Sequence, residues 1–99
     1  MRVYEVWAPP GRIWGTWTRI AELTTMKRHD YEVEFETLSS APSSFDAEIK
    51  YWIGNEQKTD FMVGPGTHKF GFGICYCAAE VRLRSHTAGQ IVRVTVKGI

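Results

Sequence analysis

The sequence contains little of what would place it in a special class of protein. Two cysteines in 99 residues are too few for a disulfide framework. Lysine and arginine (12 residues) nearly balance aspartate and glutamate (11 residues), so the chain lacks the cationic surplus that bulk nucleic-acid binding requires. No apolar run approaches the ~18–20 residues of a membrane span, and the start, which carries Glu5, lacks the apolar segment of a secretory signal. We therefore predict no membrane span, and a place in the cytoplasm or release as part of an assembly.

What the chain does contain is enough apolar side chain for a core. Hydrophobic residues make up 43% of the sequence and aromatic residues 13%. Disordered chains combine low hydrophobicity with high net charge, so this composition argues against disorder. A chain of this length rarely divides into two cores. We therefore expect residues 1–99 to form a single domain.

Apolar and polar residues alternate along most of the chain, with the period of a half-buried strand. In the segment 31–37, Tyr31, Val33 and Phe35 share one face and three glutamates share the other. The same rhythm predicts further strands over 2–7, 47–53, 60–63, 67–72, 80–84 and 90–96. The segment 14–23 fits either a helix or a strand, and we favour a strand because it has no clear helix cap.

Seven or eight short strands with turn signals every ~8–12 residues are typical of an all-β sandwich or barrel. We predict a single antiparallel β-sandwich, Ig-like or jelly-roll in style. Its predicted core consists of the apolar residues on one face of each strand: Tyr31, Val33, Phe35, Ile49, Tyr51, Ile53, Phe61, Val63, Phe70, Phe72, Val81, Leu83, Val92, Val94 and Val96. Burial of each is worth about 1.5–3 kcal/mol before the entropy cost is subtracted, so a charge at Leu83 or Val94 should prevent folding.

A metal site is the sharpest chemical hypothesis, and its signal is weak. Cys75 and Cys77, with His68 and His86 brought near by strand pairing, would supply the ligands of a Cys₂His₂ zinc site. On a strand, however, two residues in this spacing lie ~6.5–7 Å apart at Cα, whereas structural zinc sites use curved turns with a wider spacing. Buried structural cysteines are the simpler interpretation, and we predict no metal and no cofactor.

Catalysis has no motif to support it. Asp46, Glu48 and Asp60 would form a carboxylate pair only if the fold brought them together. The glycines of 64–66 and 71–73 are not followed by a helical pattern, so they do not predict a phosphate-binding loop. A sandwich of this size also leaves little room for the large pocket that enzymes favour. We predict that the protein is not an enzyme.

The four tryptophans suggest a binding surface. Trp52 alternates with Glu48 and Lys50 and should face outward. Trp7, Trp14 and Trp17 flank the turn 8–12 and have no predicted face. The simplest interpretation is that two or three tryptophans cap the ends of the sandwich. The alternatives are a contact surface for a protein neighbour, because tryptophan is enriched at contact hot spots, and a stacking platform for saccharide rings.

Charged residues form two outward ladders. Arg82 and Arg84 point away from the core on one strand, Arg93 and Lys97 do so on the next, and a hairpin would place the four side by side. Such a stripe could contact phosphate, but near-neutral net charge makes nucleic acid a poor partner. The glutamates of 31–37 would pair with this stripe within one sheet, or make the molecule two-faced if the ladders lie on different sheets.

The absence of a catalytic motif and the outward aromatic and charged residues favour a non-catalytic interaction or assembly module. Its predicted partner is a protein or a second copy of the chain, as in a structural subunit of a larger assembly. The alternative is a carbohydrate-binding module that uses surface tryptophans, and a small metalloprotein or enzyme ranks third. The candidate binding residues are Trp7, Trp14, Trp17, Trp52, Arg82, Arg84 and Arg93.

Overall fold

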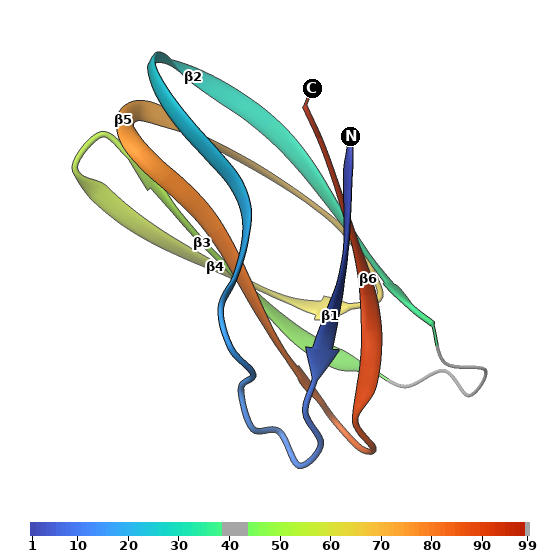
Figure 1. The fold of residues 1–99 in the computed structure, drawn as a ribbon. Coiled ribbons are helices and arrows are strands. Elements are labelled where there is room, and N and C mark those ends of the chain that lie inside the picture. Colours follow the sequence, from blue (N-terminus) through green and yellow to red (C-terminus); the bar gives the residue numbers. More distant parts are fainter. Residues whose placement is uncertain (39–43, 99) are drawn as a thin grey trace.

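The structure, a computed structural model, describes residues 1–38 and 44–98, and within them the side chains outside 22–28 and 72–77. In these residues the chain forms six strands, drawn in Figure 1: β1 (Arg2–Ala8), β2 (Thr18–Thr37), β3 (Phe45–Ile53), β4 (Glu56–Gly64), β5 (Gly66–Ser85) and β6 (Gln90–Gly98). Neighbouring strands pair antiparallel in the order β1-β6-β2-β5-β3-β4. The outermost strands of this order are β1 and β4.

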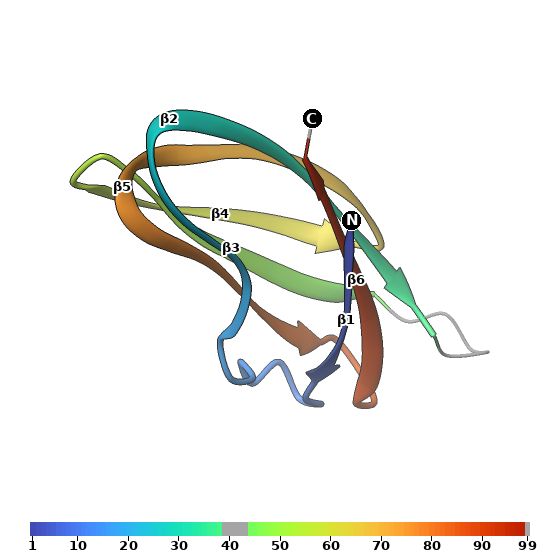
Figure 2. The same ribbon diagram turned by 45° about the horizontal axis from the view of Figure 1, so that its top comes forward.

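Two long strands, β2 and β5, run through both layers of the molecule. Each has 20 residues, and Figures 1 and 2 show them bending together at one end. The first sheet contains β1, β6, the second half of β2 and the first half of β5. The second sheet contains the first half of β2, the second half of β5, β3 and β4. Register shifts in β2 after Arg19 and after Thr25 are the bulges that allow such a bend.

The predicted all-β class and antiparallel sandwich are confirmed. Because β2 and β5 each contribute to both sheets, the six strands form two sheets of four strands each. The expected short strands differ from the real ones in one respect. Of the segment 14–23, residues 18–23 belong to β2, which continues through 31–37, and residues 14–17 precede this strand. The segments 67–72 and 80–84 are likewise parts of one strand, β5. Between these segments the sequence has no clear two-residue alternation, so the pattern divides one strand into two.

The core lies between the sheets. It consists of Val6, Ala8, Ile20, Ala21, Val33, Phe35, Phe45, Ala47, Ile49, Tyr51, Phe70, Ala79, Val81, Leu83, Val92, Val94 and Val96. Most of the predicted core residues are among them. Tyr31 and Ile53 are only partly buried and pack against this cluster, and Phe72 lies outside the described side chains.

The predicted face of β4 is wrong. Phe61 and Val63 are 53% and 55% exposed, and Met62 and Gly64 face the core instead. The reason lies at the end of the strand, where Gly64 pairs with Phe45. A Cβ at Gly64 would lie 2.3 Å from the Phe45 ring, so that ring occupies the space of a side chain. The alternation then points Phe61 and Val63 to the outside.

Polar contacts join the two sheets where their edges approach each other. On one side the Tyr4 hydroxyl of β1 donates a hydrogen bond to the Ile20 carbonyl of β2, at 3.2 Å. On the other side, which we name the β4–β5 seam, His68 Nε2 lies 2.8 Å from Asp60 Oδ2, and the Tyr51 hydroxyl donates to the same oxygen at 3.0 Å. Asp60 can therefore face inward because it gains two partners at the edge of the core.

Candidate interaction surface

A ladder of ion pairs covers the outer face of the second sheet. Each pair joins β5 to β3: Arg84 Nε to Asp46 Oδ2 at 2.7 Å, Arg82 Nε to Glu48 Oε1 at 2.6 Å, and Glu80 Oε1 to Lys50 Nζ at 3.4 Å. The register places the two members of every pair directly opposite each other. Arg82 and Arg84 of the predicted basic stripe are thus neutralised by carboxylates of the next strand, and they do not present free cations to phosphate.

Trp14 and Trp17 lie over this ladder. The Arg84 guanidinium is 4.3 Å from the centre of the Trp14 ring, and that of Arg82 is 4.5 Å from the centre of the Trp17 ring. Lys50 Nζ is 4.3 Å from the Trp17 ring. Such cation–π contacts are worth about 0.5–1 kcal/mol each at exposed sites and more when desolvated. The two tryptophans thus clamp the segment before β2 onto the sheet.

Backbone hydrogen bonds hold that segment in place. Between β1 and β2 the chain follows the end of β5, where Gly15 N donates to the Leu83 carbonyl at 2.9 Å and Arg12 N to the Ser85 carbonyl at 3.1 Å. Ser85 N donates in return to the Pro9 carbonyl at 2.8 Å. These bonds extend the second sheet by an irregular edge and place the tryptophans above the arginines.

Asp46 is the most deeply buried acid of the ladder, at 3% exposure. Besides Arg84 it contacts His86, whose Nε2 lies 2.6 Å from Asp46 Oδ1. Burial by itself raises the pKa of Asp46, but the hydrogen bonds from His86 and Arg84 outweigh burial and hold the pKa below its usual value. Asp46 is therefore a charged tie between β3, β5 and the loop that follows β5.

Beside the ladder, strand β4 presents apolar side chains to solvent. Phe61 and Val63 occupy the outward positions next to Glu48 and Asp46 of β3. The Phe61 ring meets the Trp14 ring edge-on, with centroids 6.5 Å apart. We name Trp14, Phe61 and Val63 the β4 patch. Exposed apolar side chains that are grouped on an outermost strand, beside paired charges on the next strand, are typical of an interaction site.

The outer face of the first sheet carries the glutamate ladder of β2. It lies next to β6, and the register places Glu36 opposite Arg93 and Glu32 opposite Lys97. A hydrogen bond and repulsion from Glu36 raise the pKa of Glu34 above its usual value, and Lys97 opposes this shift. The sequence left open whether the glutamates and the cations lie on one sheet or on two. For Arg93 and Lys97 of β6 the first arrangement is found, since both lie opposite glutamates of the same sheet.

The expected stripe of four cations is wrong. Arg82 and Arg84 lie on the second sheet, whereas Arg93 and Lys97 lie on the first. The reason is that the loop from Ser85 to Gln90 joins strands of different sheets, and β6 pairs with β1 and β2 rather than with β5. A hairpin-length loop between two alternating segments does not distinguish a hairpin from such a crossing.

The other tryptophans lie apart from the clamp. Trp52 is on the outer face of β3, as predicted, opposite Gln57 of β4. Trp7 lies on the first sheet opposite Ile91 and is 51% exposed, with its ring against Gly89, where a Cβ would lie 2.5 Å from the ring. Of the seven predicted binding residues, the structure thus brings together Trp14, Trp17, Arg82 and Arg84.

The sequence missed Phe61 and Val63 as surface residues, because it placed them in the core. A signal was available in the inward positions of the same strand. Lys58 and Asp60 alternate with Gln57, Thr59 and Phe61. One face of the segment 57–63 therefore carries two charges, and the other face is only partly apolar. That pattern is ambiguous for an edge strand, since its charged face can be satisfied by neighbours.

The hypothetical zinc ligands are not brought together in the part that is described. His68 and His86 bind different aspartates, Asp60 in the β4–β5 seam and Asp46 in the ladder. The side chains of Cys75 and Cys77 lie outside the described residues. Among the described side chains there is no group of three or more histidine, cysteine or acidic residues that could hold a metal ion.

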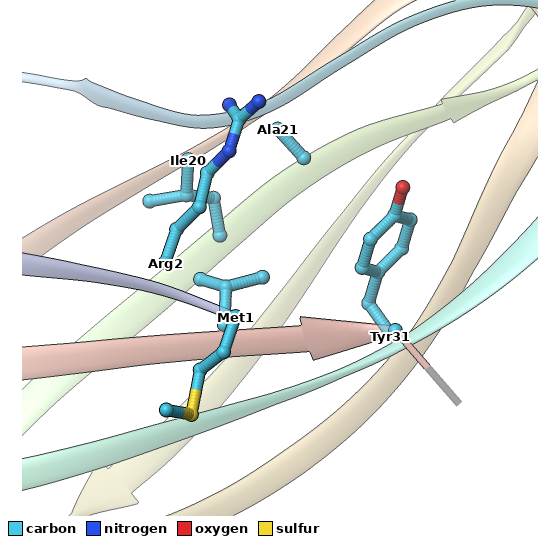
Figure 3. Close-up of a pocket in the computed structure, with 7 residues that line it drawn as sticks. Met1, Arg2, Ile20, Ala21 and Tyr31 are labelled. Carbon is cyan, nitrogen blue, oxygen red and sulfur yellow. The ribbon is translucent and has the colours of Figure 1, made fainter.

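A small cavity of about 180 Å³ opens near the N-terminus, between the sheets (Figure 3). Its lining residues are Met1, Arg2, Ile20, Ala21, Tyr31, Val96 and Gly98. The lining combines aliphatic side chains with Arg2 and Tyr31 and contains no side-chain carboxylate, histidine or cysteine.

Comparisons of this chain with protein-family models, with curated proteins and with solved structures find no match. Over the residues described, the structure holds no helix with the length and apolar character needed to cross a bilayer. The candidate surface therefore rests on its own geometry.

Proposed function

We propose that the protein is a non-catalytic module that makes protein–protein contacts through the β4 patch. The observation that carries this proposal is the exposure of more than half of Phe61 and of Val63, side by side on an outermost strand. Full burial of a side chain of either type is worth about 1.5–3 kcal/mol. A partner that covers the patch would gain this free energy, which the free chain leaves unused.

The surroundings of the patch support a contact role. Trp14 is held by the cations of Arg82 and Arg84, so one aromatic wall of the patch is ordered before any partner arrives. An ordered surface loses less side-chain entropy on binding than a mobile one. The paired charges of Arg82 with Glu48 and of Arg84 with Asp46 give the patch a polar rim, which is the usual anatomy of an interface.

The clamp argues against a saccharide platform. Sugar rings stack on the open faces of aromatic side chains, and cations already stack on Trp14 and Trp17. Trp7 and Trp52 lie on different sheets, so they do not form one platform. Protein contacts at the β4 patch use the exposed apolar groups as they stand.

The test is capture of partners from the native source with three forms of the tagged chain. The wild type is compared with the double variant Phe61→Ser, Val63→Thr and with Val3→Thr, a control that changes a similarly exposed apolar residue on β1. Retained proteins are identified by mass spectrometry, and the affinity of each purified candidate is then measured for all three forms.

We expect a partner that binds the wild type and the control equally, and the double variant at least about tenfold more weakly, the equivalent of about 1.4 kcal/mol. Circular dichroism establishes that the double variant keeps its sheet content. Equal binding of all three forms would contradict the proposal, and so would a wild type that binds neither another protein nor itself.

A further inference from the structure

We infer that strand β4, which carries Phe61 and Val63 of the β4 patch, binds a second copy of the chain, with the two β4 strands paired antiparallel about a twofold axis. The two second sheets would then form one continuous sheet across the dimer. This inference rests on the proposed function, since it names the partner of the same surface.

Strand β4 has the form of an edge that can accept another strand. All nine of its residues pair with β3 in one uninterrupted register, and its other side is the end of the strand order. The sequence 56–64 contains no proline, which would remove a donor from the ladder. Proteins usually protect such edges with a bulge, a proline or charges that disfavour pairing.

The inward charges of β4 select one register. About a twofold axis, residues of the same face meet, and one residue lies opposite itself. An axis at Lys58 or at Asp60 would place like charges opposite each other, which destabilises a strand pair. An axis at Gln57 would place Lys58 opposite Glu56, but only residues 56–58 of β4 would pair. An axis at Thr59 pairs residues 56–62 and places Lys58 of each copy opposite Asp60 of the other, so two pairs of opposite charge form in the longer ladder.

Asp60 has the acceptor capacity for this contact. The hydrogen bonds from Tyr51 and His68 both reach its Oδ2 atom, and a carboxylate offers about four lone-pair sites on its two oxygens. Lys58 lies on the same face of β4, and its Nζ lies 3.1 Å from Glu56 Oε1, its ion-pair partner among the described residues. An exchange of this exposed pair for Asp60 of the second copy costs little, because exposed ion pairs are worth about 0–1 kcal/mol.

The same register gives the exposed Phe61 a cross-strand neighbour on the outer face. With the axis at Thr59, Phe61 of one copy lies opposite Gln57 of the other. Gln57 in turn lies opposite Trp52 of its own β3. Each dimer would therefore contain two cross-strand rows in which Gln57 lies between Trp52 of its own copy and Phe61 of the other.

The first part of the test is sedimentation equilibrium of the full chain over micromolar to millimolar concentrations. We expect a monomer–dimer equilibrium in the wild type. Lys58→Glu, which places two acids opposite each other, should raise the dissociation constant at least about tenfold. Lys69→Glu, with the same change of net charge on the outer face of the first sheet, should leave it unchanged.

The second part tests the register by disulfide trapping. Thr59→Cys places two cysteines opposite each other, and mild oxidation should link the two copies rapidly. Phe61→Cys reports the competing axis at Phe61 and should link slowly. The oxidised wild type gives the background from Cys75 and Cys77, and peptide mapping identifies the linked residues.

A wild type that stays monomeric would overturn the inference. So would a Lys58→Glu variant that associates as well as the wild type, or faster linkage through Phe61→Cys than through Thr59→Cys. Oligomers larger than a dimer would indicate head-to-tail pairing of β4 with β1 and would also overturn it. A monomeric wild type that binds another protein through Phe61 and Val63 would refute only the second copy as partner, whereas a chain that binds neither would refute the proposed function as well.

Discussion

Replacement of Asp46 by asparagine should lower the free energy of unfolding by about 1.5–3 kcal/mol, the range for hydrogen bonds to charged groups. The substitution keeps the size of the side chain but removes the charge that Arg84 and His86 share at 2.7 and 2.6 Å. Loss of one partner from a fully buried pair costs about 3–5 kcal/mol. The lower range applies here because the side chains of Arg84 and His86 are partly exposed and water compensates some of the loss.

The pH dependence gives this prediction a definite sign. The pKa of Asp46 is lower in the folded chain than its ordinary value of 3.8, so unfolding makes the group easier to protonate. Its contribution to stability is complete above the unfolded pKa and is lost as the pH falls through the folded pKa. The difference in unfolding free energy between wild type and Asp46→Asn should therefore be constant near neutral pH and decrease below pH 3.8.

Urea denaturation at several pH values, followed by tryptophan fluorescence, measures both quantities. Glu34→Gln is the matched control, because a hydrogen bond with Glu36 and repulsion from its charge raise the pKa of Glu34 in the folded chain. That variant should be at least as stable as the wild type at neutral pH. A loss below about 0.5 kcal/mol for Asp46→Asn, the usual effect of a surface change, would refute the assigned role. An undiminished difference at acid pH would refute the assigned pKa shift.

Two further predictions concern the core. Gly64→Ala should destabilise the chain by about 1–3 kcal/mol, the usual cost of overpacking, because the new Cβ would lie 2.3 Å from the buried Phe45 ring. Thermal melts measure this loss, and the control Gly98→Ala, whose Cβ would meet no atom within 4 Å, should melt like the wild type. Equal melts for the two variants would contradict the geometry. Leu83→Asp should abolish the cooperative unfolding transition, because it buries a charge at a site with 0% exposure. If circular dichroism shows that this variant is folded and unfolds cooperatively, residue 83 is not part of the core.

The alternation of side chains predicts faces well where a strand is covered on one side. Val33, Phe35, Val92 and Val94 are all buried as expected, because a shift by one residue would expose the whole apolar set of the strand to water. It fails on β4, where the inward face is decided by partners on the neighbouring strands β3 and β5, which the alternation within β4 does not reveal. Asp60 is acceptable there only because Tyr51 and His68 bind it.

The order of the strands could not be predicted, and the charged surface depends on it. Arg82 and Arg84 are outward in the sequence pattern and in the structure, but only the pairing of β5 with β3 brings Glu48 and Asp46 opposite them. The clamp by Trp14 and Trp17 follows from backbone bonds between the segment before β2 and the end of β5. Neither contact leaves a local signal, because each joins segments more than thirty residues apart.

The passage of β2 and β5 through both sheets has a mechanical consequence. In a sandwich whose layers are joined only by loops, one layer can slide over the other when side-chain contacts yield. In this molecule the same sliding would strain the backbones of β2 and β5 and the hydrogen bonds that pair these two strands. A force applied at β4 passes to β3 and β5 through the hydrogen bonds of the sheet, and then along the backbone of β5 into the opposite layer, so the two layers resist shear together.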